Sequence, residues 1–213
     1  MLASAAKEYM KVYGVLVGKK PIIFTNNDTA YDCAIEFKKN GIDPVVLDIR
    51  DNSEGSVVKE AKNLNIKIKF SFGVANTKGH LRVSSATIGK LNKDKSSYEN
   101  LENISCDCIC VSGNWTPTVH LTSQSGNKLK FDQDINAFVP NQSKQKESTI
   151  GSAGGTFTLK KSLEEGFIKG YELSKKITAK EIKSSTPTSN ERTYKDHNNF
   201  WCMPLQKNKH YKR

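Results

Sequence analysis

The stretch over residues 21–31, PIIFTNNDTAY, limits what this chain can fold into more than any other. It begins with a short apolar run at residues 22–24, which is typical of a buried strand. Four polar residues follow at 25–28, and residues of these types bond backbone groups at turns and helix starts. An apolar helical pattern then resumes, and Gly41 is typical of a helix end. The stretch therefore predicts a strand, a polar turn and a helix.

The next segments extend this pattern into a nucleotide-binding type of unit. A second apolar run at residues 45–47 ends in Asp48, and strand, turn, helix, strand and acid is the opening order of a βαβ nucleotide-binding unit. A helix over residues 53–64 and an alternating strand over residues 66–72 would complete a βαβαβ half of a doubly wound sheet. Yet no glycine stands where the dinucleotide fingerprint requires three. We expect a Rossmann-like α/β fold with an altered first turn.

The remaining segments add a helix at the start, a small antiparallel meander and a long helix. The expected elements are a helix over 2–13, a strand over 81–88, a polar hairpin or loop over 90–103, a strand over 105–113, short strands at 129–132 and 137–140, a strand running into a glycine loop over 149–155, and a helix over 157–177. Residues 178–199 lose apolar content and are interpreted as a linker or poorly ordered tail. An apolar patch at residues 200–205 follows, and such a patch usually requires a partner.

Composition narrows the classes of function. The net charge is +11, but the lysines are scattered along the chain and no aromatic RNA-binding motif accompanies them, so we expect no nucleic-acid partner. No apolar run approaches the ~20 residues of a membrane span. The cysteines number five, and an odd count without paired spacing favours a reducing compartment. We therefore expect a cytoplasmic protein that does not enter a membrane.

The residues that often carry chemistry give weak signals here. Cys106, Cys108 and Cys110 alternate on an expected strand, so all three should point to one face and pack as small apolar groups instead of binding a metal. The four histidines show no metal or triad spacing. Asp28 and Asp48 appear as isolated acids, as does Asp132, without a paired-carboxylate arrangement. We expect no metal site and no catalytic residue in this chain.

Two segments remain as candidate cofactor sites. Glycines at 151–155 before a long helix would let backbone amides approach a phosphate, which a helix N-terminus also favours. Asp48 stands where a second-strand acid binds a ribose hydroxyl, although a strand-end cap explains it equally well. The candidate cofactor-binding residues are Gly151, Ser152, Ala153, Gly154, Gly155, Thr25, Asn26, Asn27 and Asp48. The turn at 25–28 is the weaker of the two sites, because its side chains also suit the capping of a helix that begins at Thr29.

Four segments together carry a family resemblance. They are residues 1–5 (MLASA), 24–31 (FTNNDTAY), 106–117 (CDCICVSGNWTP) and 151–154 (GSAG) before the helix. In this order and spacing they resemble the α subunit of heterotetrameric sarcosine oxidase, over nearly all of residues 1–177. Residues 196–205 also resemble the linker to the folate-binding domain of that subunit.

The resemblance implies a fold and a set of cofactors. The fold would be of the flavin-disulfide reductase type, with a nested nucleotide-binding domain and a small antiparallel meander. NAD would be held by the full α subunit, FAD and FMN by the β subunit, and tetrahydrofolate by a C-terminal α domain. The family's complex oxidises sarcosine, passes the one-carbon unit to tetrahydrofolate and forms hydrogen peroxide, and its further partners are the γ and δ subunits.

The chain departs from the family pattern at both ends. The glycine-rich fingerprint of the first βαβ unit would precede Met1, and the folate domain would follow Arg213. We therefore expect residues 1–177 to be a partial nucleotide-binding region and residues 178–213 a linker, in a gene fragment, a split subunit or an excised piece. The first hypothesis is an NAD-binding scaffold of a sarcosine oxidase-like complex, inactive alone. The alternatives are a non-catalytic assembly module and an α-like subunit of a related amine or opine dehydrogenase.

Overall fold

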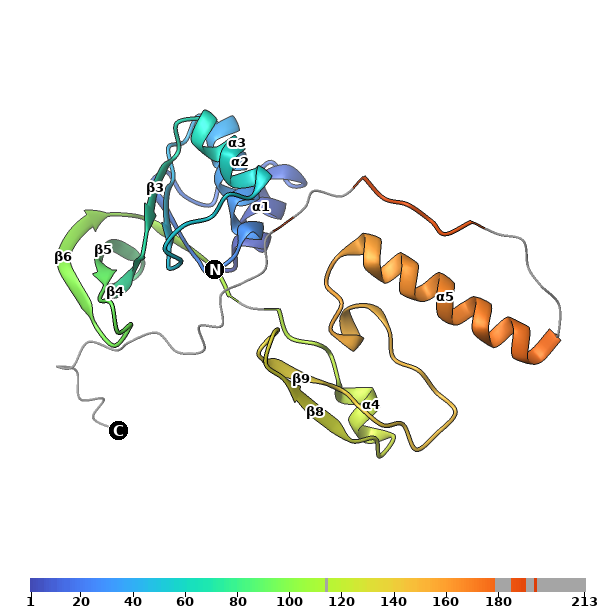
Figure 1. Cartoon of the computed structure of the whole chain (residues 1–213). Helices are drawn as coiled ribbons and strands as arrows, with labels where there is room; N and C mark the ends of the chain where they lie inside the picture. The colour runs from blue at the N-terminus through green and yellow to red at the C-terminus, as the bar shows by residue number, and fades with distance from the viewer. Residues whose placement is uncertain (114, 179–184, 191–193, 195–213) are drawn as a thin grey trace. The chain divides into compact units, whose positions relative to one another are not determined.

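The computed structural model describes residues 1–113, 115–178, 185–190 and 194 (Figure 1). The described chain divides into two compact units. The first contains residues 1–113 and Tyr194, and the second contains residues 115–178 and 185–190. The predicted boundary between residues 177 and 178 separates a linker from a nucleotide-binding region, and it stays a prediction.

A four-stranded parallel sheet forms the centre of the first unit. Its strands are β1 (Pro21–Thr25), β2 (Val45–Asp48), β3 (Lys67–Phe70) and β7 (Cys108–Ser112), in the order β3-β2-β1-β7. Ile23 lies opposite Val46 on one side and Cys110 on the other. Strands covered on both faces need apolar residues at successive positions, which explains the continuous apolar runs in the sequence. The predicted Rossmann-like α/β class is confirmed.

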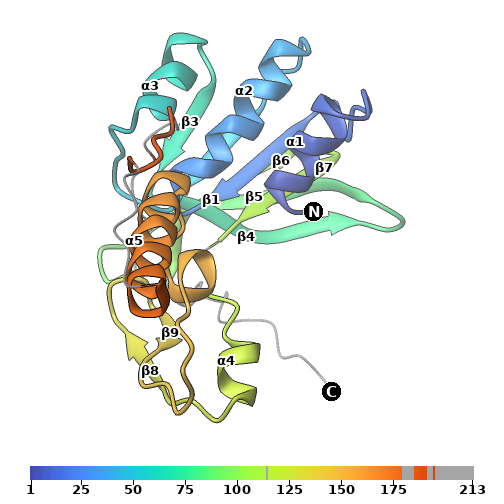
Figure 2. The ribbon, with the colours of Figure 1, turned by 90° about the vertical axis from the view of Figure 1, so that its right-hand side faces the viewer.

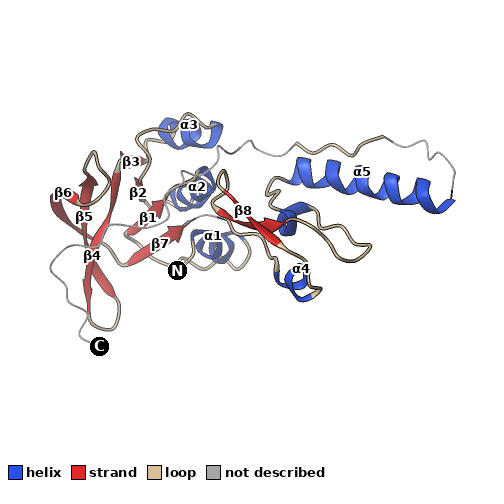
Figure 3. Cartoon of the chain, turned by 60° about the horizontal axis from the view of Figure 1, so that its bottom comes forward, coloured by secondary structure: helices blue, strands red, loops and turns tan. Residues whose placement is uncertain are grey.

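Three helices cover one face of this sheet. They are α1 (Ala3–Lys11), α2 (Tyr31–Lys39) and α3 (Ser56–Asn63), and Figures 2 and 3 show them on the same side of β1, β2 and β7. Their apolar stripes, which include Ala6, Ala34, Phe37 and Val58, form one buried cluster with alternate residues of the strands. The helices are shorter than predicted, because the sequence pattern does not mark where end residues lose their core contacts.

An antiparallel sheet covers the other face, as Figure 3 shows. It consists of β4 (Phe72–Gly79), β5 (Val83–Leu91) and β6 (Tyr98–Ser105) in sequential order. Ala86 and Ile88 of β5 pack with Ile22 and Leu47 of the parallel sheet in a second buried cluster. The predicted meander is therefore present, and the parallel sheet is the middle layer of three.

One predicted element near the meander is wrong. The alternating run at 66–72 is not one strand, because Ser71 takes a left-handed backbone conformation (φ +59°) between β3 and β4. Its amide donates to the Arg50 carbonyl, and its carbonyl accepts from the Leu91 amide. A period-two pattern continues across a tight turn, so the sequence did not show the break. The predicted polar hairpin over 90–103 is present, because β5 continues to Leu91 and pairs antiparallel with β6 from Tyr98.

Tyr98 holds the meander together across a pair of glycines. Gly73 of β4 lies opposite Gly89 of β5, and a Cβ at Gly73 would lie 2.4 Å from the Tyr98 hydroxyl oxygen. The ring therefore lies against backbone that any side chain would block. Burial raises the pKa of Tyr98 to about 12.

The cysteines lie on both faces of the parallel sheet, which corrects the prediction that all three share one face. Cys108 and Cys110 pack on the helical side, whereas Cys106 packs on the meander side. The reason is that β7 begins at Cys108, so Cys106 lies outside the alternation that relates the other two. Cys108 and Cys110 have their sulfur atoms 3.7 Å apart, and all four described cysteines are free and buried.

The second unit contains small elements and one long helix. Its elements are α4 (His120–Gln124), a two-stranded sheet of β8 (Leu129–Asp132) and β9 (Ala137–Pro140), a 3-10 turn η2 (Gly151–Gly154) and α5 (Leu159–Thr178). The two short strands and the long helix are confirmed. The predicted strand before the glycine loop is wrong, because residues 148–150 pair with no strand among the described residues. The predicted apolar patch at 200–205, and most of the predicted tail, lie outside the described residues.

Candidate functional site

The polar turn at 25–28 lies at the carboxyl end of β1, beside the end of β7. In the order β3-β2-β1-β7, the chain runs from β1 outward to β2 and β3 and then returns through the meander to β7 on the other side of β1. The strand order reverses between β1 and β7, and parallel sheets bind ligands in the crevice at such a point. Thr25 pairs with Ser112 of β7 and with Asp48 of β2. The fold therefore places the predicted residues Thr25, Asn26, Asn27 and Asp48 at the edge where a nucleotide would be expected.

Asn27 fills the crevice between the two strand ends. Its side-chain nitrogen, Nδ2, donates to the Gly113 carbonyl at 2.8 Å and to the Ser112 hydroxyl at 3.2 Å. Its side-chain oxygen accepts from the Thr29 amide at 3.0 Å, which caps the 3-10 turn η1 (Asp28–Ala30) that leads into α2. The Thr25 hydroxyl donates to the Asn27 carbonyl and accepts from its amide. The predicted capping role of this turn is confirmed.

A buried ion network lies directly beneath the turn. The Arg50 guanidinium binds Asp48 through two atoms, Nε to Oδ1 at 3.0 Å and Nη2 to Oδ2 at 2.7 Å. The same Nη2 donates to Asp28 Oδ1 at 2.8 Å. Asp28 and Asp48 are fully buried and Arg50 nearly so. The two aspartates are therefore coupled through one arginine, which corrects the prediction that they are isolated acids.

Two hydroxyl groups complete this network. Tyr31 donates to Asp48 Oδ2 at 2.7 Å, and Ser53 donates to Asp28 Oδ1 at 2.8 Å. Burial, followed by the charge of Asp48, raises the pKa of the Tyr31 hydroxyl. The hydroxyl therefore keeps its proton and donates the hydrogen bond to Asp48. Burial alone would lower the pKa of Arg50, but its bonds to Asp48 and Asp28 raise it. The network therefore holds a fixed guanidinium between two carboxylates.

Gly55 lets α3 approach the network closely. It occupies the N-cap position of α3, and a Cβ on this residue would lie 2.0 Å from Asp28 Oδ2. Asp28 therefore lies against the N-terminus of the helix, where the partial positive charge of the backbone favours a carboxylate. Any side chain at position 55 would push the helix away from the turn.

The turn at 25–28 does not fit a dinucleotide pyrophosphate as it is arranged. A phosphate cradle needs backbone amides that face a ligand, but the amides of Asn27 and Thr29 already donate to side chains of the same turn. The acids Asp28 and Asp48 lie directly beneath, and their charge disfavours a second anion. Asp48 has both oxygens occupied by Arg50 and Tyr31, so a ribose hydroxyl could reach it only if these bonds opened. Its predicted role in cofactor binding stays a prediction.

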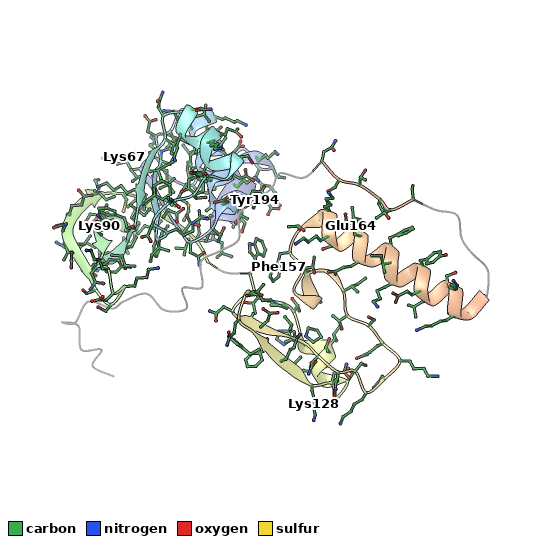
Figure 4. The ribbon with its side chains drawn as sticks, viewed as in Figure 1. Lys67, Lys90, Lys128, Phe157, Glu164 and Tyr194 are labelled. Atoms are coloured by element: carbon green, nitrogen blue, oxygen red, sulfur yellow. The ribbon has the colours of Figure 1, made fainter. Side chains whose placement is uncertain are left out.

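The glycine loop belongs to the second unit and is bound by its own helix. The Gly151 amide donates to Glu165 Oε2 at 2.8 Å, and the Thr156 hydroxyl donates to the other oxygen of Glu165. Two further amides, those of Gly155 and Thr156, donate to carbonyls of the same loop. Phe157 follows the loop with its ring 6.3 Å from that of Trp115, and Figure 4 labels it near the start of α5. A carboxylate of this chain therefore occupies one amide that a phosphate would use.

The predicted site residues thus fall into two groups that the structure describes separately. Thr25, Asn26, Asn27 and Asp48 come together with residues that the sequence analysis did not select, namely Arg50, Tyr31 and Ser53. The available signal was an arginine two positions after the strand-end acid, a spacing that lets one side chain reach back to its neighbour. Gly151 to Gly155 form the separate turn. Their role in cofactor binding stays a prediction.

Among the described residues, no group of three or more His, Cys, Asp and Glu side chains is placed to hold a metal ion. In the same part of the chain, no helix has the length and apolar character needed to cross a bilayer.

Curated proteins similar to this chain confirm the family resemblance. The chain is 29% identical over 168 residues to sarcosine oxidase subunit α from Corynebacterium sp. strain P-1, which covers 78% of this chain but 17% of that protein. It is 29% identical over 167 residues to the same subunit from Rhizobium meliloti strain 1021, covering 78% and 16%. The chain thus spans a small part of the length of these relatives. No family model matches it.

A solved structure supports the fold class. The HOCl-induced flavoprotein disulfide reductase RclA from Escherichia coli, solved as a Cu(II) complex, superposes with a TM-score of 0.54 at 13% identity. The match covers 74% of this chain and 36% of that one. At this identity the likeness speaks for the fold alone. The chain therefore has the α/β architecture of the flavin-disulfide reductases and is similar in sequence to the sarcosine oxidase α subunit.

Proposed function

We propose that this chain is a structural part of an oxidoreductase subunit that resembles sarcosine oxidase α and works in a cytoplasmic, multisubunit flavoenzyme. The similarity over 78% of the chain to three sarcosine oxidase α subunits carries this proposal. The complex would demethylate sarcosine oxidatively, pass the one-carbon unit to tetrahydrofolate and form hydrogen peroxide. FAD and FMN would be held by a β subunit, and γ and δ subunits would complete the assembly.

Within such a complex, the first unit would act as a scaffold and not as the dinucleotide site. The support is the turn at 25–28, where Asn27 bridges β1 and β7 and the amides are bonded internally. NAD would be held elsewhere in a full α subunit, with the loop at 151–155 as the candidate contact from this chain. In that arrangement Glu165 would release the Gly151 amide, and the backbone amides of the loop would bind phosphate oxygens. When bound, NAD would supply a redox-active nicotinamide.

Titration of the whole chain with NAD by calorimetry tests the scaffold role. We expect no heat of binding at NAD concentrations up to about 1 mM. A dissociation constant of about 1 mM corresponds to a binding free energy of about −4 kcal/mol, so any binding would be weaker than this. A micromolar dissociation constant would overturn the scaffold role. The matched variant is Asn27→Gly, which opens the crevice; if it gained affinity for NAD, the Asn27 bridge would be the element that excludes the cofactor.

Assembly tests the other half of the proposal. The chain would be co-expressed with the flavoprotein β subunit of a sarcosine oxidase, and the pair would be separated by size-exclusion chromatography. Co-elution with retained flavin absorbance supports a subunit role. Elution as two separate species would favour the remaining alternatives, a non-catalytic assembly module for a different partner or a part of a related amine or opine dehydrogenase.

A further inference from the structure

The end of helix α1 and the segment just after it carry apolar side chains that are exposed, in contrast to the buried face of the helix. Ala3, Ala6 and Met10 face the core cluster and are nearly inaccessible to solvent. A second set, here called the α1 patch, lies at the end of the helix and just beyond it. It consists of Tyr9, Val12, Tyr13, Val15 and Leu16, which are between 41% and 67% exposed. Single exposed apolar residues are common, but five within eight positions mark an interaction surface.

The α1 patch is an ordered surface that contains a hollow. The rings of Tyr9 and Tyr13 lie 5.8 Å apart, and the Val15 amide donates to the Tyr9 carbonyl, which folds the segment after the helix back on it. Beside them is a hollow of about 360 Å³ lined by Ala5, Glu8, Tyr9 and Tyr13. Paired tyrosines around a hollow are typical of the anchoring centre of an interface, because the rings bury large areas at low entropic cost.

Tyr194 brings a distant part of the chain to this helix. Its hydroxyl donates to Asp32 Oδ2 at 2.9 Å, and its ring packs against the core cluster of the first unit, where Figure 4 labels it. Lys7 of α1 binds the same Asp32 oxygen at 2.9 Å. Tyr194 therefore lies near α1, although it follows Tyr13 by 181 positions in the chain.

An apolar segment follows this anchor after a short spacer. Residues 200–205 read Phe-Trp-Cys-Met-Pro-Leu, six positions beyond Tyr194. Six residues can span roughly 20 Å. The anchor shares the Asp32 oxygen with Lys7, which is two positions before Tyr9 in α1. The segment is therefore long enough to reach the end of the α1 patch that contains Tyr9.

We propose that residues 200–205 dock on the α1 patch, with an aromatic side chain in the hollow between Tyr9 and Tyr13. A tethered segment binds at an effective concentration in the millimolar range, so modest apolar contact is enough to hold it, whereas a separate partner would need far more. The same contact would bury the apolar groups of both surfaces. This inference does not depend on the enzymatic role proposed above.

The fluorescence of Trp201 tests the contact directly. The chain contains two tryptophans, so Trp115→Phe leaves Trp201 as the only reporter. We expect blue-shifted emission and weak quenching by iodide, and the change Tyr9→Asp with Tyr13→Asp should shift the emission to the red and raise quenching severalfold. Leu81→Asp is the matched control, because Leu81 is 94% exposed in the turn between β4 and β5. Emission of a fully solvated tryptophan in Trp115→Phe alone would overturn the proposal.

Disulfide trapping distinguishes this chain from other occupants of the patch. Cys33, Cys106, Cys108 and Cys110 are buried, which leaves Cys202 as the native thiol for a trap. With Tyr13→Cys, mild oxidation should join the introduced thiol to Cys202 of the same chain, seen as a faster-migrating monomer on a non-reducing gel. Leu81→Cys should give none. A disulfide-linked dimer in place of the monomer band would assign the patch to a second copy, and no crosslink of either kind would also contradict the proposal.

Discussion

The two polar turns that the sequence offered as cofactor sites differ in how their polar groups are satisfied. At 25–28, buried side chains bond backbone amides, a neighbouring strand and an arginine held by two aspartates. At 151–155, three of the five residues are glycines, and a glutamate from the following helix supplies the main side-chain contact. The polar groups of the first turn are bonded by its own side chains and by the buried network around Arg50. The second turn depends on one glutamate of the helix that follows it.

This difference agrees with the packing of the two units. Nearly all of the fully buried apolar residues among those described belong to the first unit, whereas Ala137 and Val139 are the buried apolar residues of the second. A turn that anchors a three-layer core tolerates little movement, because its contacts are shared by the three strands β1, β2 and β7 and by the helices that follow β1 and β2. A turn on a small unit can exchange an internal carboxylate for another anion at lower cost. Four substitutions would test this difference between the two turns.

The largest effect is expected from Arg50→Met. This change leaves Asp28 and Asp48 buried without their shared cation, and breaking a buried ion pair by removing one partner costs about 3–5 kcal/mol. Urea denaturation followed by circular dichroism would measure it. Lys38→Met is the control, because Lys38 and Asp43 form an exposed pair worth about 0–1 kcal/mol. Equal losses of unfolding free energy in the two variants would show that the buried ion network does not stabilise the turn.

Tyr31→Phe removes one donor from the same network. The loss of a hydrogen bond to a carboxylate should lower the free energy of unfolding by about 1.5–3 kcal/mol, less than the loss of Arg50. Because the folded-state pKa of Tyr31 is raised above its ordinary value of 10.0, its contribution is complete below pH 10 and decreases as the pH rises further. The variant should lack this part of the alkaline decline, and Tyr9→Phe should retain it. Parallel stability curves for wild type and Tyr31→Phe above pH 10 would count against the assignment.

Gly155→Ala tests the geometry of the second turn. Gly155 has φ +100°, and a Cβ there would lie 3.1 Å from Val139 Cγ1. The strained backbone and the close contact should destabilise the second unit by about 1–2 kcal/mol. Gly170→Ala, in α5 with no neighbouring atom within 4 Å, should instead stabilise it by about 0.5–1 kcal/mol. Trp115 fluorescence in a Trp201→Phe background would follow this unit, and effects of the same sign would contradict the interpretation.

Glu165→Gln should give the smallest effect. The amide keeps one acceptor for the Gly151 amide but loses the charge, so about 1 kcal/mol of local stability should be lost. Hydrogen exchange of the Gly151 amide should accelerate, while amides of β1 keep their protection. Glu164→Gln, its neighbour on α5, is the matched control. Unchanged exchange at Gly151 would show that the loop does not depend on this carboxylate.

Local patterns were enough to predict most of the fold. Continuous apolar runs identified β1 and β2, because strands buried on both faces tolerate few polar residues. The order of segments 1–5, 24–31, 106–117 and 151–154 was enough to indicate the relatives that the comparison found. The same patterns missed the break at Ser71 and the side of Cys106, since both depend on where a strand starts and stops in space.

The amino-acid pattern alone shows that a strand runs into the polar residues 25–28, without the three glycines of a dinucleotide fingerprint. The role of those residues follows from the three-dimensional fold. Arg50, Ser53 and Ser112 come from other segments, and their contacts with the turn span 22, 25 and 85 positions. A hydrogen bond over such a distance leaves no periodic trace in the chain, because it depends on strand order and helix packing. The turn at 25–28 therefore connects β1, β2 and β7 through hydrogen bonds and buried ion pairs.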